Sequence, residues 1–243
     1  MFLPLVVTIV AFAFAAVLIK QFRERRRPYQ LVWSAALLMG GLAGLAFVLF
    51  LGQGRNEVFF KAYYIFGALL MAAYLGLGEI YLLASRRIAD MVAGALLVLS
   101  VVGLLLVAFA PVDTAVLHGS NVEGGTKAIS GPAIIFIAVL NTFGAVAVIG
   151  GACYSALRVW KRHSPLRFLA SNVLIATGTV LASLAGTLAR VTSSGGSFWA
   201  LLAAGFVVLF AGFLLTTAWR PRSAPVRQSS IGSQPSAVST DKP

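Results

Sequence analysis

The feature of this sequence that most constrains its fold is a series of seven apolar windows, each close to the length of a membrane-spanning helix. A helix crossing a hydrocarbon core roughly 30 Å thick needs about 20 apolar residues, because it rises about 1.5 Å per residue. The windows are residues 2–19, 31–51, 62–84, 91–110, 133–157, 168–189 and 198–219. None alternates with the period of two that is typical of membrane β-barrel strands. The pattern predicts an all-α, polytopic membrane protein with seven transmembrane helices in one bundle over residues 1–219.

The composition agrees with this prediction. Hydrophobic residues make up 59% of the 243 residues and charged residues only 11%, and the mean hydropathy is +0.92. Too few charges are present to keep such a chain in solution, which excludes a disordered chain, a coiled coil and a nucleic-acid binder as descriptions of the whole protein. Cys153 is the only cysteine, so an intrachain disulfide is excluded as well.

The distribution of Lys and Arg predicts the orientation, since positively charged loops stay on the cytoplasmic side. Fifteen of the 19 basic residues follow windows 1, 3, 5 and 7: Lys20, Arg23, Arg25, Arg26, Arg27, Arg86, Arg87, Arg158, Lys161, Arg162, Arg167, Arg220, Arg222, Arg227 and Lys242. The other four are Arg55, Lys61, Lys127 and Arg190. We therefore expect the amino terminus outside and the carboxyl terminus inside.

The last 24 residues, 220–243, are rich in Ser, Pro and Gln, and we expect a disordered basic tail in the cytoplasm. The net charge of +12 then indicates attraction to an anionic inner leaflet, and no nucleic-acid partner is expected. The predicted location is the cytoplasmic (inner) membrane.

An odd number of spans makes the first three and the last three helices parallel, which is the arrangement of a 3+1+3 repeat. An offset of 137 residues pairs Arg25 with Arg162 and Gly41 with Gly178. Identity over the whole length is close to what this composition gives by chance, so the repeat is a hypothesis about topology only.

Glu79 is the ionisable residue that the sequence places inside the third span. Gly76, Ala72 and Ala68 precede it at helical spacing, so the carboxyl should share a face with small residues and pack against other helices. Ionisable groups in lipid are often functional, and Glu79 is a candidate for a proton or cation site. The alternative is a carboxyl near the inner surface that is hydrated or paired with Arg86, Arg87 or another inner arginine.

The sixth window carries a column of polar and small residues at spacings of three and four. Its polar members are Asn172, Thr179, Ser183, Thr187 and Arg190. Asn141 of the fifth window is expected at the depth of Ser183, and Asn172 at the depth of Glu79. The column either lines a polar path or ligand site, or it forms structural hydrogen bonds, since Ser and Thr often bond to the carbonyl four residues earlier.

Small residues predict close helix packing at several positions. Gly40 and Gly44 form a G-x-x-x-G pair, and Gly76, Gly178 and Gly186 lie in small-residue stripes. Tyr63, Tyr64 and Trp199 lie near the predicted outer boundary, where aromatic residues commonly form an interfacial belt.

Several chemistries are excluded. Both histidines, His118 and His163, lie in predicted loops, and the spacing of Asp113, His118 and Glu123 matches no established metal-ligand pattern. The last window has no lysine for a Schiff base, and no catalytic triad or phosphate loop is present. We expect no metal, no cofactor and no enzymatic activity.

The third window contains a further pattern of aromatic, glycine and leucine residues: Tyr63, Tyr64, Gly67, Ala68, Leu69, Leu70, Leu75, Gly76, Leu77, Gly78, Tyr81, Leu82 and Leu83. In this pattern the chain resembles a class of small bacterial seven-helix membrane proteins, and more distantly the seven-helix sensor regions of bacterial histidine kinases. The resemblance implies sensing of a ligand or of the membrane state, without site residues that can be carried over. Together with the richness in Ala and Gly, it also implies that the membrane is that of a bacterium.

The sequence therefore predicts a non-enzymatic sensory or accessory bundle that binds a small molecule or a partner membrane protein. The alternative is a small-solute transporter, proton-coupled through Glu79, with a polar path along the sixth helix.

The predicted orientation can be tested with a reporter. Alkaline phosphatase, which is active only in the periplasm, should stay inactive when fused after Pro243, whereas green fluorescent protein at the same position should fluoresce. Phosphatase activity at that position would contradict the predicted cytoplasmic carboxyl terminus.

Overall fold

The computed structural model describes residues 2–119, 122, 128–161, 166–192 and 195–217. For residues 159–161, 167, 168, 186–192, 195, 216 and 217, only the backbone is described. The predicted tail, residues 220–243, lies outside the described residues.

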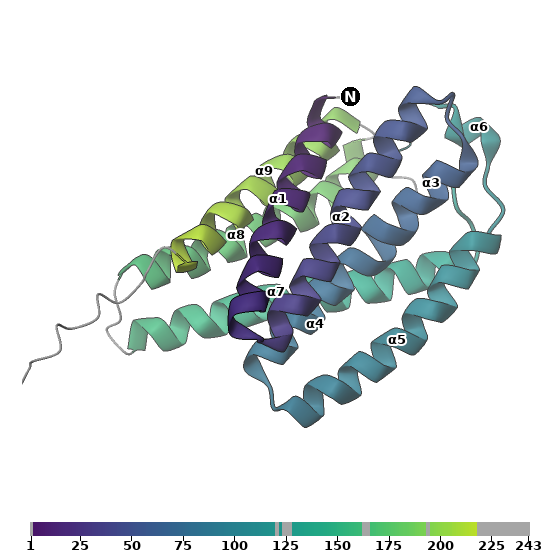
Figure 1. Cartoon of the computed structure of the whole chain (residues 1–243). Helices are drawn as coiled ribbons and strands as arrows, with labels where there is room; N and C mark the ends of the chain where they lie inside the picture. The colour runs from purple at the N-terminus through teal and green to yellow at the C-terminus, as the bar shows by residue number, and fades with distance from the viewer. Residues whose placement is uncertain (1, 120–121, 123–127, 162–165, 193–194, 218–243) are drawn as a thin grey trace, which may run out of the picture.

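The described chain is helical apart from short connections (Figure 1). Its elements are α1 (Phe2–Arg25), α2 (Pro28–Gly52), α3 (Glu57–Tyr63), the π-helix η1 (Tyr64–Met71), α4 (Ala72–Leu83), α5 (Arg86–Phe109), α6 (Thr114–Leu117), α7 (Ala133–Lys161), α8 (Leu166–Thr192) and α9 (Gly195–Thr217). Each predicted window lies within, or overlaps, one long helical segment. Pro28 begins α2, where its missing N–H has no helical partner to lose.

Six of these helical segments are long and apolar enough to cross a membrane: α1, α2, α3–η1–α4, α5, α7 and α9. In α8 the apolar stretch within the described side chains is shorter, from Leu169 to Ala185. Large hydrophobic side chains are exposed on the outer faces of the helices, and α5 carries many of them, including Leu97, Val98 and Val101. An apolar exterior of this kind is what a helical membrane protein presents to lipid.

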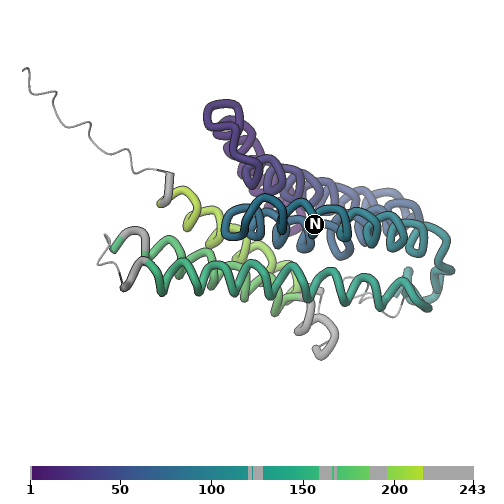
Figure 2. Tube along the Cα trace, turned by 90° about the horizontal axis from the view of Figure 1, so that it is seen from below, coloured from purple at the N-terminus to yellow at the C-terminus, as the bar shows by residue number. Residues whose placement is uncertain are grey.

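Six helices form a closed ring. Contacts join α1 to α2, α2 to α4, α4 to α7, α7 to α8, α8 to α9, and α9 back to α1. Phe14 of α1 packs on α9 through ring contacts with Phe210 and Phe213, at centroid distances of 4.9 and 4.8 Å. Helix α5 lies outside the ring against α4, η1 and α7. Figure 2 shows α7, α8 and α9 on one side of the bundle and the earlier helices on the other.

Glycines let the ring helices approach closely. A Cβ atom at Gly76 of α4 would lie 2.9 Å from the Cα of Gly144 in α7, and a Cβ at Gly144 would overlap the carbonyl of Ala72. Between α8 and α9, a Cβ at Gly178 would lie 2.6 Å from the backbone nitrogen of Leu209. Lipid tails are as apolar as leucine, so helix association in a membrane relies on such close packing.

Residues between α5 and α7 form a cap at one end of the bundle. Leu117, Val122 and Ile129 are buried and join the hydrophobic core, and Val112 pairs with Ile129 in a short antiparallel bridge. Arg55 holds the cap by donating from Nη1 to the carbonyl oxygens of Leu117 and Gly119. The segment around His118, which the sequence placed in a loop, thus packs its apolar side chains on the core.

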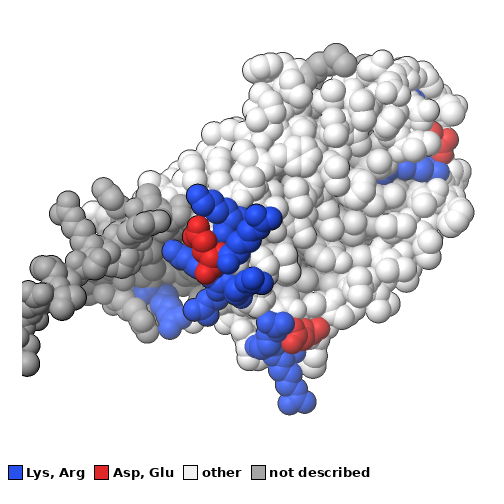
Figure 3. Space-filling view, viewed as in Figure 1, with Lys and Arg blue, Asp and Glu red and all other residues white. Residues whose placement is uncertain are grey.

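Charged groups fix the turn between α4 and α5 at the opposite end. The Tyr81 hydroxyl donates to Asp90 Oδ1 over 2.7 Å, and Arg86 forms an ion pair with Asp90 at 3.0 Å. The Arg86 guanidinium also lies 5.4 Å from the centre of the Tyr81 ring. The space-filling view shows charged side chains at the two ends of the bundle, with an uncharged surface between them (Figure 3).

Two α7 glycines form a matched test of close packing. Gly144→Ala should lower the free energy of unfolding by about 1–3 kcal/mol, because the new methyl overlaps the α4 backbone. Gly150→Ala should be neutral or slightly stabilising, since nothing lies within 4 Å of its Cβ position. Unfolding of the two variants in mixed micelles by a denaturing detergent measures the difference. Equal effects would contradict the α4–α7 contact.

Candidate functional site

A cavity of about 420 Å³ lies inside the ring. Helices α1, α2, α7, α8 and α9 line it, together with the α3–η1–α4 segment. A volume of this size falls in the range of small-molecule sites in proteins. The cavity exists because six helices around one centre leave space that the small side chains on their inner faces do not fill. These small residues are Gly40, Ala43, Gly44, Gly67, Ala68, Ala72, Ala138, Gly144, Ala145 and Ala182.

The π-helix η1 forms one wall of the cavity. Tyr64, Gly67, Ala68 and Met71 of this segment are lining residues. A π-helix closes its hydrogen bonds five residues apart, which widens the turn and changes which residues share a face. Long π-helical stretches are rare and are frequently found at functional sites, so η1 marks this part of the span as the candidate site.

The cavity wall is apolar, with a few hydrogen-bonding groups and no formal charge among its described lining residues. The polar lining residues are Tyr63, Tyr64, Asn141, Thr142, Thr179, Ser183 and Trp199. Asn141 and Ser183, which we expected at one depth, both line it. A few polar groups in an apolar wall are typical of sites that orient a small molecule.

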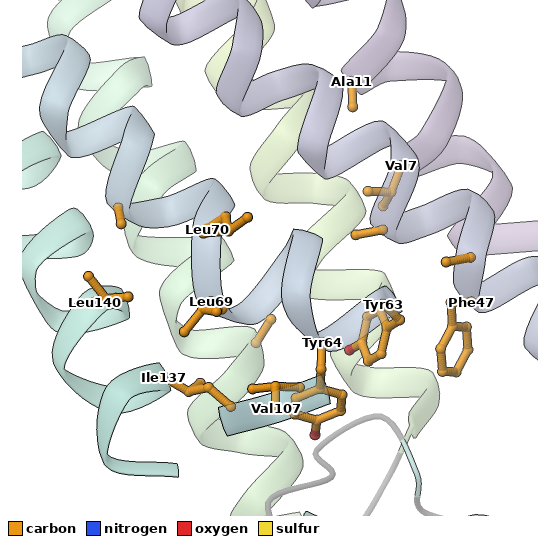
Figure 4. Packing of buried hydrophobic residues seen from close by; sticks show 14 of the residues in the cluster. Val7, Ala11, Phe47, Tyr63, Tyr64, Leu69, Leu70, Val107, Ile137 and Leu140 are labelled. Carbon is orange, nitrogen blue, oxygen red and sulfur yellow. The ribbon is translucent and has the colours of Figure 1, made fainter. Parts of the chain in front are cut away.

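An aromatic cluster lies beside the cavity. The Trp199 ring centroid lies 4.8 Å from that of Phe47 and 6.1 Å from that of Tyr63, and the Tyr63 and Tyr64 rings meet edge to face at 5.2 Å. The close view shows both tyrosine rings projecting from the chain where α3 meets η1, with Phe47 beside Tyr63 (Figure 4). The prediction of an interfacial belt is wrong for Tyr63, Tyr64 and Trp199, because all three side chains are buried.

Trp199 also contributes a buried hydrogen-bond donor. Its side chain is 4% exposed, and its indole Nε1 has no partner among the residues that the structure describes. An unsatisfied buried N–H costs free energy that an acceptor could recover.

The cavity opens between α7 and α8. Ala138 and Thr142 on α7 and Ser183 on α8 line the cavity and are also exposed. On α7 their neighbours Ile135 and Val139 are exposed as well, on the outer surface of the bundle. The exposed lining residues and their apolar neighbours therefore place the opening on the outer face of α7.

Glu79 is 5% exposed and lies outside the cavity lining. It is buried between α4 and α7, where its carboxyl packs directly on Gly151, and it lies one helical turn beyond the lining residue Leu75. No described residue forms a hydrogen bond or ion pair with it, and Arg86, one of its expected partners, pairs with Asp90 instead. The carboxyl therefore lies near the cavity with close backbone contacts around it.

The polar column of α8 divides between two environments. The Thr179 hydroxyl donates to the carbonyl of Ile175 over 2.8 Å, the back-bonding that the structural alternative anticipated. Thr179 and Ser183 line the cavity, whereas Asn172 is half-buried further along the helix and is not a lining residue. The side chains of Thr187 and Arg190 lie outside the described residues.

The predicted packing glycines occupy internal contacts. Gly40 faces Met71 and Phe206 at the cavity, and Gly44 faces Thr8 and Pro4 of α1. The G-x-x-x-G pair is therefore used within the chain. Gly76 contacts α7 and Gly178 contacts α9. The surroundings of Gly186 lie outside what the structure describes.

The role of Trp33 in joining two helices was not predicted from the sequence, although Gly78 is a signal for it. Its indole Nε1 donates to the carbonyl of Leu75 over 2.9 Å, and its ring packs on Gly78. The glycine before Glu79 gave room for a large ring from another helix, but the sequence does not say which one. Trp33 thus ties α2 to α4 between the cavity and Glu79.

Comparison of the chain with protein-family models, with curated proteins and with solved structures finds no match.

Paired substitutions test which polar groups join helices. Trp33→Phe should lower the free energy of unfolding by about 1 kcal/mol, because it removes a hydrogen bond between α2 and α4. Thr179→Val should change it by less than about 0.5 kcal/mol, because the lost bond lies within α8. Detergent unfolding measures both. A cost for Thr179→Val as large as that for Trp33→Phe would show that the threonine hydroxyl bridges helices.

Proposed function

We propose that this chain is a seven-span protein of the bacterial cytoplasmic membrane, with its amino terminus outside. Support for α8 as the seventh span comes from its length of 27 residues, about 40 Å at the helical rise, and from its position between α7 and α9. The orientation rests on the basic residues of the α1–α2 and α4–α5 turns. The 3+1+3 repeat assigns α1, α2 and α3–η1–α4 to one half, α7, α8 and α9 to the other, and α5 to the linker.

Within this topology, we infer that the protein is a non-enzymatic sensory or accessory bundle that binds a small molecule at the centre of the ring. The observation that carries this inference is the cavity of about 420 Å³ between η1, α7, α8 and α9. Binding there would bridge the two halves of the ring and alter their spacing, which is how a bundle without a catalytic group can report a ligand to a partner membrane protein.

Proton-coupled transport of a small solute is the second candidate. The observation that favours it is Glu79, a buried carboxyl without a described partner, one turn from the cavity. Transport through the ring would require the glycine contacts beyond the cavity, such as Gly76 with Gly144, to separate during each cycle.

Cysteine labelling separates the two candidates. In a Cys153→Ala background, Thr179→Cys and Ser183→Cys should resist a membrane-impermeant maleimide if the cavity opens only to lipid. Val58→Cys, at a position 70% exposed near the start of α3, is the positive control. Rapid labelling of both cavity cysteines would establish a water path and favour transport.

Proton flux provides an independent test. Proteoliposomes containing a trapped pH-sensitive dye should behave like empty liposomes after a pH jump if the protein only binds a ligand. If it conducts or couples protons, flux should appear and should be lost in Glu79→Gln. Glu57→Gln is the matched control, because Glu57 is a carboxylate paired with Lys61 at the other end of the same span. Flux that depends on Glu79 and not on Glu57 would replace the binding bundle with a transporter.

A further inference from the structure

We propose that the cavity binds an uncharged, lipid-soluble molecule that carries a hydroxyl or carbonyl group and enters from the bilayer between α7 and α8. This inference rests on the proposed small-molecule function and specifies its ligand class.

The charge of the ligand follows from the wall. The described lining residues carry no formal charge, and the buried carboxylate nearest to the cavity, Glu79, is turned to Gly151 outside it. A charged molecule would lose its hydration without gaining a counter-ion, which costs several kcal/mol in a medium of low dielectric constant. An uncharged molecule avoids this cost.

The apolar body of the ligand follows from the shape and composition of the interior. Tyr63, Trp199 and Phe206 present ring surfaces, and Met71 and Leu202 add flexible apolar groups. Next to these apolar groups, away from the polar mouth, water gains little, because an ordered water needs two to four polar partners. A ring or chain of methylene groups would instead gain contacts with the wall.

The polar group of the ligand follows from the mouth. Asn141 offers an amide and Thr142 and Ser183 offer hydroxyls, so donors and acceptors gather on the side where α7 faces α8. These groups are complementary to one hydroxyl or carbonyl and would fix the orientation of the molecule. The Nε1 of Trp199, which has no partner within the described part of the chain, offers a donor to an acceptor in the interior.

The route follows from what closes the remaining sides. The aromatic cluster of Phe47, Tyr63 and Trp199 fills the space on one side, and the α4–α7 contact at Gly76 and Gly144 closes the opposite side. The exposed lining residues lie on α7 and α8. A molecule dissolved in the membrane reaches this opening without crossing water.

Photolabelling in proteoliposomes tests this proposal. The probe is a long-chain fatty alcohol with a diazirine in its chain, and adducts are located by mass spectrometry. Two further probes carry the same chain: a trimethylammonium compound and a phosphatidylcholine. We expect the alcohol to label lining residues such as Tyr63, Asn141 and Trp199, and an excess of unlabelled alcohol to remove those adducts. The phosphatidylcholine should label only outward positions such as Val139 and Leu97.

Two α7 variants serve as a matched pair. Ala145→Phe adds a ring at a lining position and should reduce adducts in the cavity at least fivefold. Val139→Phe adds the same ring at a position that is 54% exposed and outside the lining, and should leave them unchanged. If Ala145→Phe does not fold, the positions of the alcohol adducts in the wild-type protein test the proposal without this variant.

The other outcomes are separable. Labelling of the cavity by the ammonium probe, but not by the alcohol, would overturn the uncharged class while leaving small-molecule binding in place. Labelling by the phosphatidylcholine at the same positions would show that an ordinary membrane lipid fills the space, and would overturn a dedicated ligand. Alcohol adducts confined to outward positions, with no probe inside the cavity, would overturn this proposal, while the labelling and flux experiments above decide the proposed function separately.

Discussion

Close approach of helix backbones is the constraint on which this structure depends. Surrounding lipid removes the hydrophobic force between helices, so packing and hydrogen bonding must hold the ring together. The closest contacts lie at glycines, with Gly76 and Gly144 between α4 and α7 and Gly178 and Gly205 between α8 and α9. At each of these positions the missing side chain lets the backbone of the neighbouring helix come into direct contact. The ring is therefore tight where glycines face one another and open where the wall changes to alanines and a π-helix.

The cavity is a consequence of that uneven packing. Small lining residues such as Ala43, Gly67 and Ala145 leave volume at the centre, while η1 gives the third span a wider turn at the same level. Rings from Phe47, Tyr63 and Trp199 then enclose it on one side. Empty volume in a protein interior costs contacts, and this cost is the physical basis of the proposed binding site.

Hydropathy was sufficient to predict the long helices, because each must satisfy its own backbone in lipid. It could not predict the site. The π-helix cannot be recognised in a pattern of apolar residues. Whether Trp199 is buried at a cavity depends on which helices are its neighbours, and the sequence does not give this. Small-residue spacing indicated that Gly76 and Gly178 pack closely, but not against which helix. The contrast is clearest at Glu79, whose burial was anticipated and whose contact with Gly151 was not.

The proposed entrance between α7 and α8, together with the cap that Arg55 holds over one end, determines which concentration of a ligand sets the occupancy of the cavity. A compound using this entrance equilibrates first with the membrane, so occupancy follows its mole fraction among the lipids and not its aqueous concentration. Two compounds with the same intrinsic affinity would then differ in apparent potency by the ratio of their partition coefficients. On the proposed route, a change in membrane composition would alter the occupancy of the cavity even at a constant aqueous concentration of the compound.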